Sequence, residues 1–170
     1  MGQTQYHIDE INLFDRDSFL SVFGSVFEDS LWAAELVFEY LPFSSVDLFV
    51  ERFCQCVLDV GHQKQLQLLC AHPELGSNKK MADASVKEQI GAGIRDTEQE
   101  QRLLLQELNA LYRQKFEFPF IIAVKGLTPE LIVKQMQQRL LNDRDTEFDN
   151  CLKQVFKIAR IRLDDILVKE

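Results

Sequence analysis

The chain has 170 residues, enough for one globular domain that buries roughly two-thirds of its unfolded surface. Hydrophobic residues make up 46% and charged residues 27%, as in ordinary soluble proteins, and thirteen Phe residues predict an aromatic-rich core. The net charge of −8 argues against nucleic acid as the main partner, because phosphate binding requires clustered Lys and Arg. Nothing reaches the roughly 18 apolar residues that span a membrane, so no membrane partner is expected.

Helical periodicity dominates the first half of the chain. One amphipathic helix is predicted from apolar residues spaced i, i+3, i+4, i+7 and i+8, namely Phe19, Val22, Phe23, Val26 and Phe27. A short helix is expected over 32–37. A third begins at Ser44 or Ser45, which are good caps, and ends at Gly61, and a fourth covers 63–71.

The second half alternates loops and helices. Residues 72–84 lose periodicity and form a predicted loop, followed by a short helix around 85–92. A long helix is predicted over 98–115, with Leu104, Leu108, Leu111 and Tyr112 facing inward. The apolar, β-branched run 116–124 has no strand partner elsewhere, so we expect a buried extended connector.

Two further helices complete the prediction. Thr128-Pro129-Glu130 is typical of a helix start, with a capping hydroxyl, Pro in the first turn and an acid near the positive end. Asp145 or Thr146 is expected to cap the last helix, which runs to about Leu167. The sequence therefore predicts an all-α, single-domain compact bundle of about seven to nine helices over residues 1–170.

The four cysteines, Cys54, Cys56, Cys70 and Cys151, have neither zinc-ligand spacing nor an evident disulfide pairing. We interpret them as free buried thiols in a reducing compartment. The N-terminal residues show neither the basic start nor the apolar run of a secretory signal. A cytoplasmic location is therefore expected.

Arg162 is predicted to point inward from the last helix. The inward stripe of that helix is expected to contain Phe148, Leu152, Val155, Ala159, Leu163 and Ile166. At about 100° per residue, Arg162 lies only about 20° from Val155, whereas Arg160 lies about 140° away and should face solvent. A buried guanidinium is rarely left unpaired, so Arg162 is either a snorkelling or salt-bridged structural residue or a clamp for an anion.

His72 follows the fourth predicted helix and precedes Pro73, which restricts His72 to an extended backbone. Histidine has an ordinary pKa near neutrality, so His72 could donate or accept a proton. It could equally be a structural or solvated loop residue. A metal site built from His62, His72 and Glu74 lacks the usual ligand spacing, so no metal is expected.

Ser85 and Glu88 have two compatible interpretations. A Ser followed three residues later by Glu is a helix capping box. Alternatively, Glu88 points into a cavity lined by Ile90 and the connector over 119–124. A carboxylate there would be partly desolvated and would need Arg162 or a substrate donor to stay ionised.

These residues occur in stretches that together resemble the OHCU decarboxylase family, named for 2-oxo-4-hydroxy-4-carboxy-5-ureidoimidazoline. The stretches are Phe-Glu-Asp-Ser-Leu-Trp-Ala-Ala-Glu (27–35), His-Pro-Glu-Leu-Gly (72–76), Ser-Val-Lys-Glu-Gln-Ile-Gly-Ala-Gly (85–93), Leu-Asn-Ala-Leu-Tyr-Arg-Gln-Lys-Phe (108–116), Phe-Pro-Phe-Ile-Ile-Ala-Val-Lys-Gly (118–126) and Lys-Ile-Ala-Arg-Ile-Arg-Leu (157–163). Two positions depart from the pattern: Glu117 stands where the family usually has Gly, and Leu31 where it usually has Pro. Both flank the presumed pocket and bear on substrate fit more than on reaction type.

The resemblance implies an all-α, cofactor-free, commonly dimeric enzyme of urate breakdown. Its implied reaction converts the ureidoimidazoline to (S)-allantoin, following hydroxyisourate hydrolase. The resemblance also implies that His72 is the catalytic acid and that Glu88 and Arg162 complete the polar set. The implied substrate contacts are Pro73, Ser85, Gln89, Phe120, Ile121, Ile122, Ala123 and Val124.

The resulting hypothesis needs neither metal nor cofactor. Arg162 and nearby backbone donors hold a small anionic substrate, carbon dioxide leaves as its electron pair enters the substrate's own carbonyl, and His72 protonates the carbanion. This requires His72, Glu88 and Arg162 to converge in one dry cavity, where apolar side chains exclude water. Two alternatives are a decarboxylase of a related ureido or imidazole acid and a non-catalytic helical interaction module.

Overall fold

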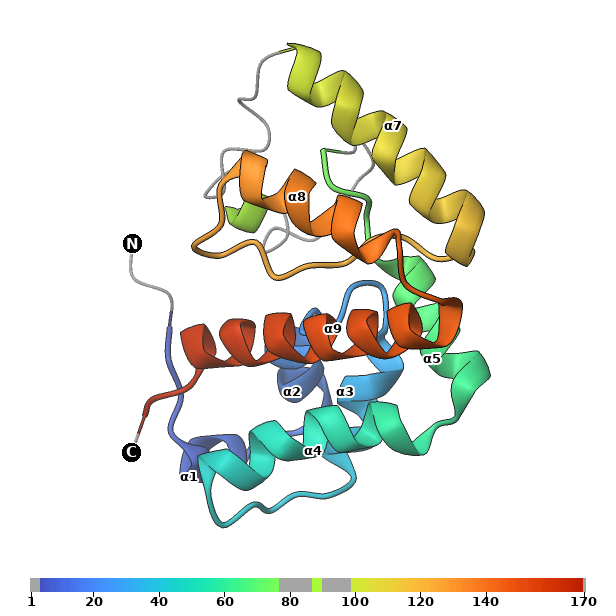
Figure 1. Ribbon diagram of the computed structural model, residues 1–170. Helices are drawn as coiled ribbons and strands as arrows, with labels where there is room; N and C mark the ends of the chain where they lie inside the picture. The colour runs from blue at the N-terminus through green and yellow to red at the C-terminus, as the bar shows by residue number, and fades with distance from the viewer. Residues whose placement is uncertain (1–3, 77–86, 90–98, 170) are drawn as a thin grey trace. The chain divides into compact units, whose positions relative to one another are not determined.

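The computed structural model describes residues 4–76, 87–89 and 99–169 (Figure 1). In these ranges the named elements are eight α-helices, and the only β-type pairing is an isolated bridge between Tyr6 and Leu167. The all-α prediction is therefore confirmed. The helices belong to two compact units, residues 1–68 with 156–170 and residues 69–155, which are described separately below. A single domain over 1–170 stays a prediction.

The first unit contains four complete helices and parts of two others. The complete ones are α1 (Ile8–Ile11), α2 (Arg16–Phe23), α3 (Leu31–Phe38) and α4 (Val46–Asp59). The first part of α5 (His62–Ala71) and the last part of α9 (Arg144–Ile166) also belong to this unit, so both helices contribute residues to both units. The Ser45 hydroxyl caps α4 by accepting from the Leu48 N–H, as the sequence predicted.

The first predicted helix is shorter than its apolar pattern suggested. α2 ends at Phe23, so Val26 and Phe27 are buried outside a helix and that part of the prediction is wrong. The helix stops at Gly24, where an added Cβ would approach the Leu31 side chain to 2.6 Å. The glycine therefore lets the start of α3 pack against the end of α2.

Aromatic rings from α2 and α4 form the core of this unit. Phe19, Phe23, Phe49 and Phe53 are all fully buried. The Phe23 and Phe49 ring centroids lie 5.1 Å apart at 72°, and those of Phe49 and Phe53 lie 5.3 Å apart at 86°. Such edge-to-face pairs contribute about 0.5–1.5 kcal/mol each beyond the burial of their area. The abundance of Phe thus accounts for the packing of α2 on α4.

The two ends of the chain meet within the first unit. The Tyr6 N–H donates to the Ile166 carbonyl at 2.9 Å, and the Val168 N–H donates to the Tyr6 carbonyl at 3.0 Å. Tyr6 also packs edge-on against Phe14. These contacts attach the segment before α1 to the end of α9.

The second unit contains α7 (Gln99–Phe116) and α8 (Pro129–Arg139), with the remaining parts of α5 and α9. The buried residues of α7 are Leu105, Leu108, Asn109, Tyr112 and Phe116. Leu108 and Tyr112 are buried as predicted. Leu104 and Leu111, also predicted to face inward, are 37% and 47% exposed, so the prediction was wrong for these two. The run of three leucines over 103–105 fits more than one face, and the contact that buries Asn109 is not visible in the sequence.

The helix starts in this unit are set by side-chain caps. The Thr128 hydroxyl accepts from the Leu131 N–H, as predicted for α8. For α9, Asp143 accepts from the Thr146 N–H at 2.8 Å, so the cap is Asp143, not Asp145 or Thr146 as predicted. Asp143 lies outside the apolar pattern, and for that reason periodicity placed the start too late.

Residues 117–124 form the connector predicted over 116–124; Phe116 ends α7, and Glu117 is exposed. They have no helix or strand, and Phe118, Phe120 and Ile121 are at most 3% exposed.

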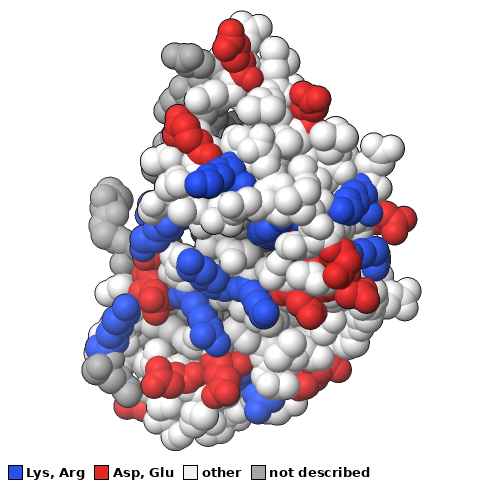
Figure 2. Space-filling model, viewed as in Figure 1, with Lys and Arg blue, Asp and Glu red and all other residues white. Residues whose placement is uncertain are grey.

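On the face shown in Figure 2, Lys and Arg side chains are interspersed with Asp and Glu side chains. No helix in the described part of the chain combines the length and apolar character needed to cross a membrane.

Candidate functional site

His72 lies in the second unit, directly after α5, and is 8% exposed. Its N–H donates to the Leu69 carbonyl at 3.2 Å, which closes the last turn of the helix. The following loop is held by Asn109 of α7, whose Nδ2 donates to the Leu75 carbonyl at 3.0 Å. His72 is therefore buried, and its backbone is held at the end of α5.

A second contact joins this loop to the turn that carries Glu88 and Gln89. The Gly76 N–H donates to Gln89 Oε1 at 3.1 Å, and Gln89 is 4% exposed. Gly76 has φ 71°, a left-handed conformation that glycine adopts without strain. The structure thus brings the His72 loop and the 87–89 turn together, whereas Ser85, a predicted substrate contact, lies outside the described residues.

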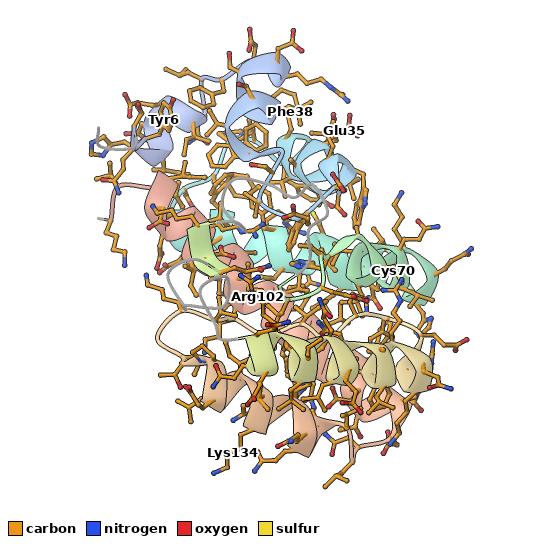
Figure 3. The ribbon with its side chains drawn as sticks, turned by 90° about the horizontal axis from the view of Figure 1, so that it is seen from above. Tyr6, Glu35, Phe38, Cys70, Arg102 and Lys134 are labelled. Carbon is orange, nitrogen blue, oxygen red and sulfur yellow. The ribbon has the colours of Figure 1, made fainter. Side chains whose placement is uncertain are left out.

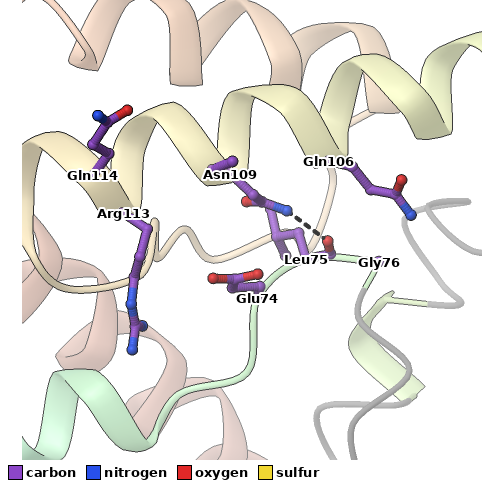
Figure 4. Close-up of a pocket in the computed structure, with 8 residues that line it drawn as sticks. Glu74, Leu75, Gly76, Gln106, Asn109, Arg113 and Gln114 are labelled. Atoms are coloured by element: carbon purple, nitrogen blue, oxygen red, sulfur yellow. Dashed lines mark hydrogen bonds between the residues drawn. The ribbon is translucent and has the colours of Figure 1, made fainter.

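A pocket of about 550 Å³ opens beside the loop (Figure 4). Figure 4 shows Glu74, Leu75 and Gly76 on one side and side chains of α7 on the other, with the bond from Asn109 to Leu75 between them. The α7 side chains that line it are Gln106, Asn109, Ala110, Arg113 and Gln114. Neither His72 nor the 120–124 segment lines this pocket, so it is not the cavity expected from the sequence.

The predicted substrate-lining segment, Phe120 to Val124, is buried throughout. Side chains of α8 and α9 hold its backbone: Arg139 Nη1 donates to the Ile121 carbonyl at 2.8 Å, and the Ala123 N–H donates to Gln154 Oε1 at 3.0 Å. The Arg139 guanidinium also lies 4.5 Å from the centroid of the Phe120 ring. The segment is therefore fixed by specific polar contacts as well as by packing.

Arg139 belongs to a buried polar network that the sequence analysis missed. Its Nε donates to Glu147 Oε2 at 2.9 Å, and its Nη2 lies 3.3 Å from Cys151 Sγ. The Tyr112 hydroxyl donates to the same Glu147 oxygen, and Asn142 and Asn150 donate to the other. The sequence did contain a signal for Arg139. Around the axis of α8, Arg139 lies about 20° from the buried Ile132, the same angle that separates Arg162 from Val155 on α9.

The charges in this network are set by its hydrogen bonds. Burial raises the pKa of Glu147, but donors from Tyr112, Asn142 and Asn150 and the charge of Arg139 outweigh it, so the net pKa is lowered. Burial raises the pKa of Tyr112, and the neighbouring Cys151 and Glu147 raise it further. Glu147 is thus ionised and Tyr112 is a neutral donor at neutral pH.

Arg162 lies in the first unit and is 5% exposed, so its predicted inward orientation is confirmed, as is the exposure of Arg160. Its Nη1 lies 3.4 Å from Glu28 Oε2 and donates to the Val26 carbonyl at 3.2 Å. Glu28 is itself 3% exposed. A buried salt bridge, one of the two roles left open by the sequence, is therefore present. The convergence of Arg162 with His72 and Glu88 stays a prediction.

The cysteines carry no disulfide, and three of the four are buried. Cys70, labelled on α5 in Figure 3, is exposed, so the expectation of four buried thiols was wrong at that position. Burial raises the pKa of the Cys54, Cys56 and Cys151 thiols, which disfavours the nucleophilic thiolate. No three His, Cys, Asp or Glu side chains of the described residues are placed to hold a metal.

Comparison with known proteins places this chain in a family. The family model described as OHCU decarboxylase matches residues 12–164. The chain belongs to the OHCU decarboxylase family. The resemblance inferred from the sequence is thereby confirmed, although the roles of individual residues stay predictions.

Relatives of the OHCU decarboxylase family match most of the chain. The 2-oxo-4-hydroxy-4-carboxy-5-ureidoimidazoline decarboxylase of Haloferax volcanii is 41% identical, covering 92% of this chain and 93% of the relative. The protein of the same name from Halalkalicoccus jeotgali is 38% identical, and the match covers 97% of this chain and 94% of the relative.

A solved structure of similar fold supports the helical architecture. The crystal structure of an (S)-allantoin synthase has a TM-score of 0.76 at 23% identity. The match covers 95% of this chain and 54% of that chain, so this chain spans about half its length. At this identity the likeness shows the fold alone.

Proposed function

We propose that this protein is a cofactor-independent carboxy-lyase that converts 2-oxo-4-hydroxy-4-carboxy-5-ureidoimidazoline to (S)-allantoin in urate breakdown. The observation that carries the proposal is 41% identity with the Haloferax volcanii decarboxylase over 92% of the chain. The buried His72, fixed in a loop joined to the turn of Glu88 and Gln89, gives further support.

The chemistry follows from the substrate's own atoms. Its name places a hydroxyl and a carboxylate on the same ring carbon, in a ring that keeps one double bond. When the bond to the carboxylate breaks, carbon dioxide leaves and the electron pair enters the unsaturated ring. A ring nitrogen and the neighbouring ring carbon each gain a proton, while the hydroxyl loses its proton and becomes a carbonyl, so one proton is taken up for each carbon dioxide released. The substrate thus supplies its own electron sink.

In this proposal His72 delivers the proton from one side and so fixes the handedness of the product. Glu88 orients either His72 or the ureido nitrogens, and Arg162 binds the anionic end of the substrate, because a guanidinium pairs with carboxylates. Pro73, Ser85 and Gln89 contact the substrate. The apolar residues proposed to line the substrate are Phe120, Ile121, Ile122, Ala123 and Val124.

We further propose that the enzyme is a cytoplasmic homodimer that acts after hydroxyisourate hydrolase. The location is supported by the four free cysteines, which are usual in a reducing compartment, and the dimer by the family resemblance. Sedimentation of the purified protein at several concentrations tests the dimer. A single species of monomer mass at all concentrations would contradict it.

A stereochemical assay tests the reaction. Urate oxidation followed by hydroxyisourate hydrolysis generates the substrate, and circular dichroism then follows the appearance of optically active allantoin. We expect this protein to accelerate the formation of one enantiomer over the spontaneous reaction. No acceleration would leave the two alternatives, a decarboxylase of a related ureido or imidazole acid and a non-catalytic helical module, and a related acid used as substrate distinguishes them.

A further inference from the structure

The contacts that hold the 119–124 segment fall on alternate residues. The Pro119 carbonyl lies 3.8 Å from Cys151 Sγ, the Ile121 carbonyl accepts from Arg139, and the Ala123 N–H donates to Gln154. In an extended chain, successive residues direct their backbone N–H and C=O groups to opposite sides. One side of the segment is therefore attached to α8 and α9.

The opposite side presents the backbone groups of Phe120 and Ile122. Among the described residues, the structure gives these N–H and C=O groups no hydrogen-bond partner. Both residues are nevertheless buried, at 1% and 9% exposure. In an extended backbone these N–H and C=O groups alternate along one side, so this side of the segment is suited to a ligand rich in amide-like donors and acceptors.

Arg139 and Gln154 determine which backbone groups face which side. Arg139 is held by Glu147 and Cys151 and cannot follow the segment if it rotates, because its planar guanidinium contacts both partners and Ile121 at once. Gln154 accepts from the N–H of Ala123, which lies two residues after Ile121. A rotation of the segment that exchanged its two sides would break both contacts.

We propose that Arg139 and Gln154 are positioning residues, which fix the 119–124 segment so that the backbone groups of Phe120 and Ile122 bind the ureido and ring amide groups of the substrate. The inference rests on the proposed function, since it assigns two residues that support its substrate contacts. Neither residue touches the substrate itself. Glu147 acts one step further away, by holding Arg139.

The test measures KM and kcat for Gln154→Leu, Gln154→Glu, Arg139→Lys and Tyr112→Phe, with thermal unfolding of each variant. Gln154→Leu removes the acceptor for the Ala123 N–H, whereas Gln154→Glu keeps an acceptor oxygen. Tyr112→Phe is the matched control, because it loses bonds to Glu147 and Cys151 but leaves the contacts to the segment in place. Partial unfolding lowers the apparent kcat but leaves KM unchanged, so KM separates positioning from stability.

We expect KM to rise roughly threefold to tenfold in Gln154→Leu and in Arg139→Lys, the effect of weakening about one hydrogen bond to the substrate. KM should return to the wild-type value in Gln154→Glu and stay there in Tyr112→Phe. If the wild type is active but KM is unchanged in Gln154→Leu, the inference is overturned and the proposed function stands. The same holds if KM rises as much in Tyr112→Phe as in Gln154→Leu. An inactive wild type would overturn the proposed function and this inference together. If Arg139→Lys does not fold, the Gln154 pair decides the result.

Discussion

Arg162 and Glu28 form an ion pair in which both side chains are almost fully buried. Charges in such a place lose their hydration, so the pair is costly to break even if it is of little net benefit to form. The Val26 and Ser25 carbonyls also accept from Arg162. A guanidinium has five N–H donors, so a structural role and ligand binding are compatible for Arg162.

Glu28→Gln is expected to lower the free energy of unfolding by roughly 2–4 kcal/mol, because it removes the carboxylate of a buried ion pair. Urea unfolding at neutral pH measures this loss. The control is Glu35→Gln, which removes a shorter contact of 2.7 Å with Arg16. That pair is solvent-exposed and should cost less than about 1 kcal/mol. Equal losses would mean that burial does not decide the strength of these pairs.

His72→Ala is expected to lower kcat by roughly 10²–10⁴-fold, the usual contribution of a positioned acid, and to yield allantoin of mixed handedness. A chiral assay of the product measures both effects. His62→Gln, at the start of α5, serves as the control and should keep its rate and its single enantiomer. If His72→Ala still gives one enantiomer at near wild-type rate, then His72 does not deliver the proton.

At the level of secondary-structure elements, the connector after α7 begins with an unusual backbone conformation. Glu117 has φ 67°, in the left-handed region that is costly for residues other than glycine. Its exposed carboxylate lies 3.6 Å from Arg144, and its carbonyl lies 3.7 Å from Cys70 Sγ. This conformation suits glycine, the residue that the family resemblance led us to expect here, so Glu117 bears on backbone geometry.

Replacing Glu117 with Gly should therefore give a more stable protein than replacing it with Ala. Both variants lose the carboxylate, so their difference isolates the backbone. We expect Glu117→Gly to exceed Glu117→Ala by about 0.5–1 kcal/mol in unfolding free energy, since the relief of strain is partly offset by the greater freedom of glycine in the unfolded chain. Thermal and urea unfolding of the two variants measure it. An Ala variant as stable as the Gly variant would contradict strain at this position.

Periodicity predicted the helices well where one apolar face was unambiguous. α3, α4, α5 and α8 were placed to within a few residues, and the angular argument for Arg162 was confirmed. On α7 it was wrong for Leu104 and Leu111, and it missed the buried Asn109, which binds the Leu75 carbonyl. Such a contact joins residues 34 positions apart, and no local pattern encodes it.

At the level of the whole molecule, the Glu147 network ties folding to pH. Burial alone would raise the Glu147 pKa, but hydrogen bonds and Arg139 lower it below its ordinary value of 4.5. A carboxyl group with a lowered pKa stabilises the folded state at pH values above the ordinary one. This contribution is lost as the pH falls through the folded pKa.

Glu147→Gln should therefore destabilise the protein at pH 7 by roughly 3–5 kcal/mol, as expected for breaking a buried pair, and by less at about pH 3.5. Urea unfolding of wild type and variant at both pH values gives the two differences. Asp149→Asn, an exposed carboxylate on the same helix, should change little at either pH. A difference that stays constant or grows on acidification would show that ionisation of Glu147 is not the cause.

The candidate site was predictable only in part. The sequence indicated His72, Gln89 and the 120–124 segment, and the structure joins the first two through Gly76 and buries the third. It did not indicate Tyr112, Arg139 or Glu147, whose partners come from three helices. Tyr112 was predicted to face inward but without polar partners. Arg139 and Glu147 were not singled out, because polar residues on amphipathic helices are usually solvated.

The boundaries between the two units fall inside α5 and α9, not in loops. Severing the polypeptide at either boundary would expose fresh helical ends, each with up to four backbone groups lacking partners. Neither half can thus be excised or grafted onto another scaffold without cutting a helix. New chain termini introduced near residues 68 and 155, as in a circular permutant, should accordingly be poorly tolerated.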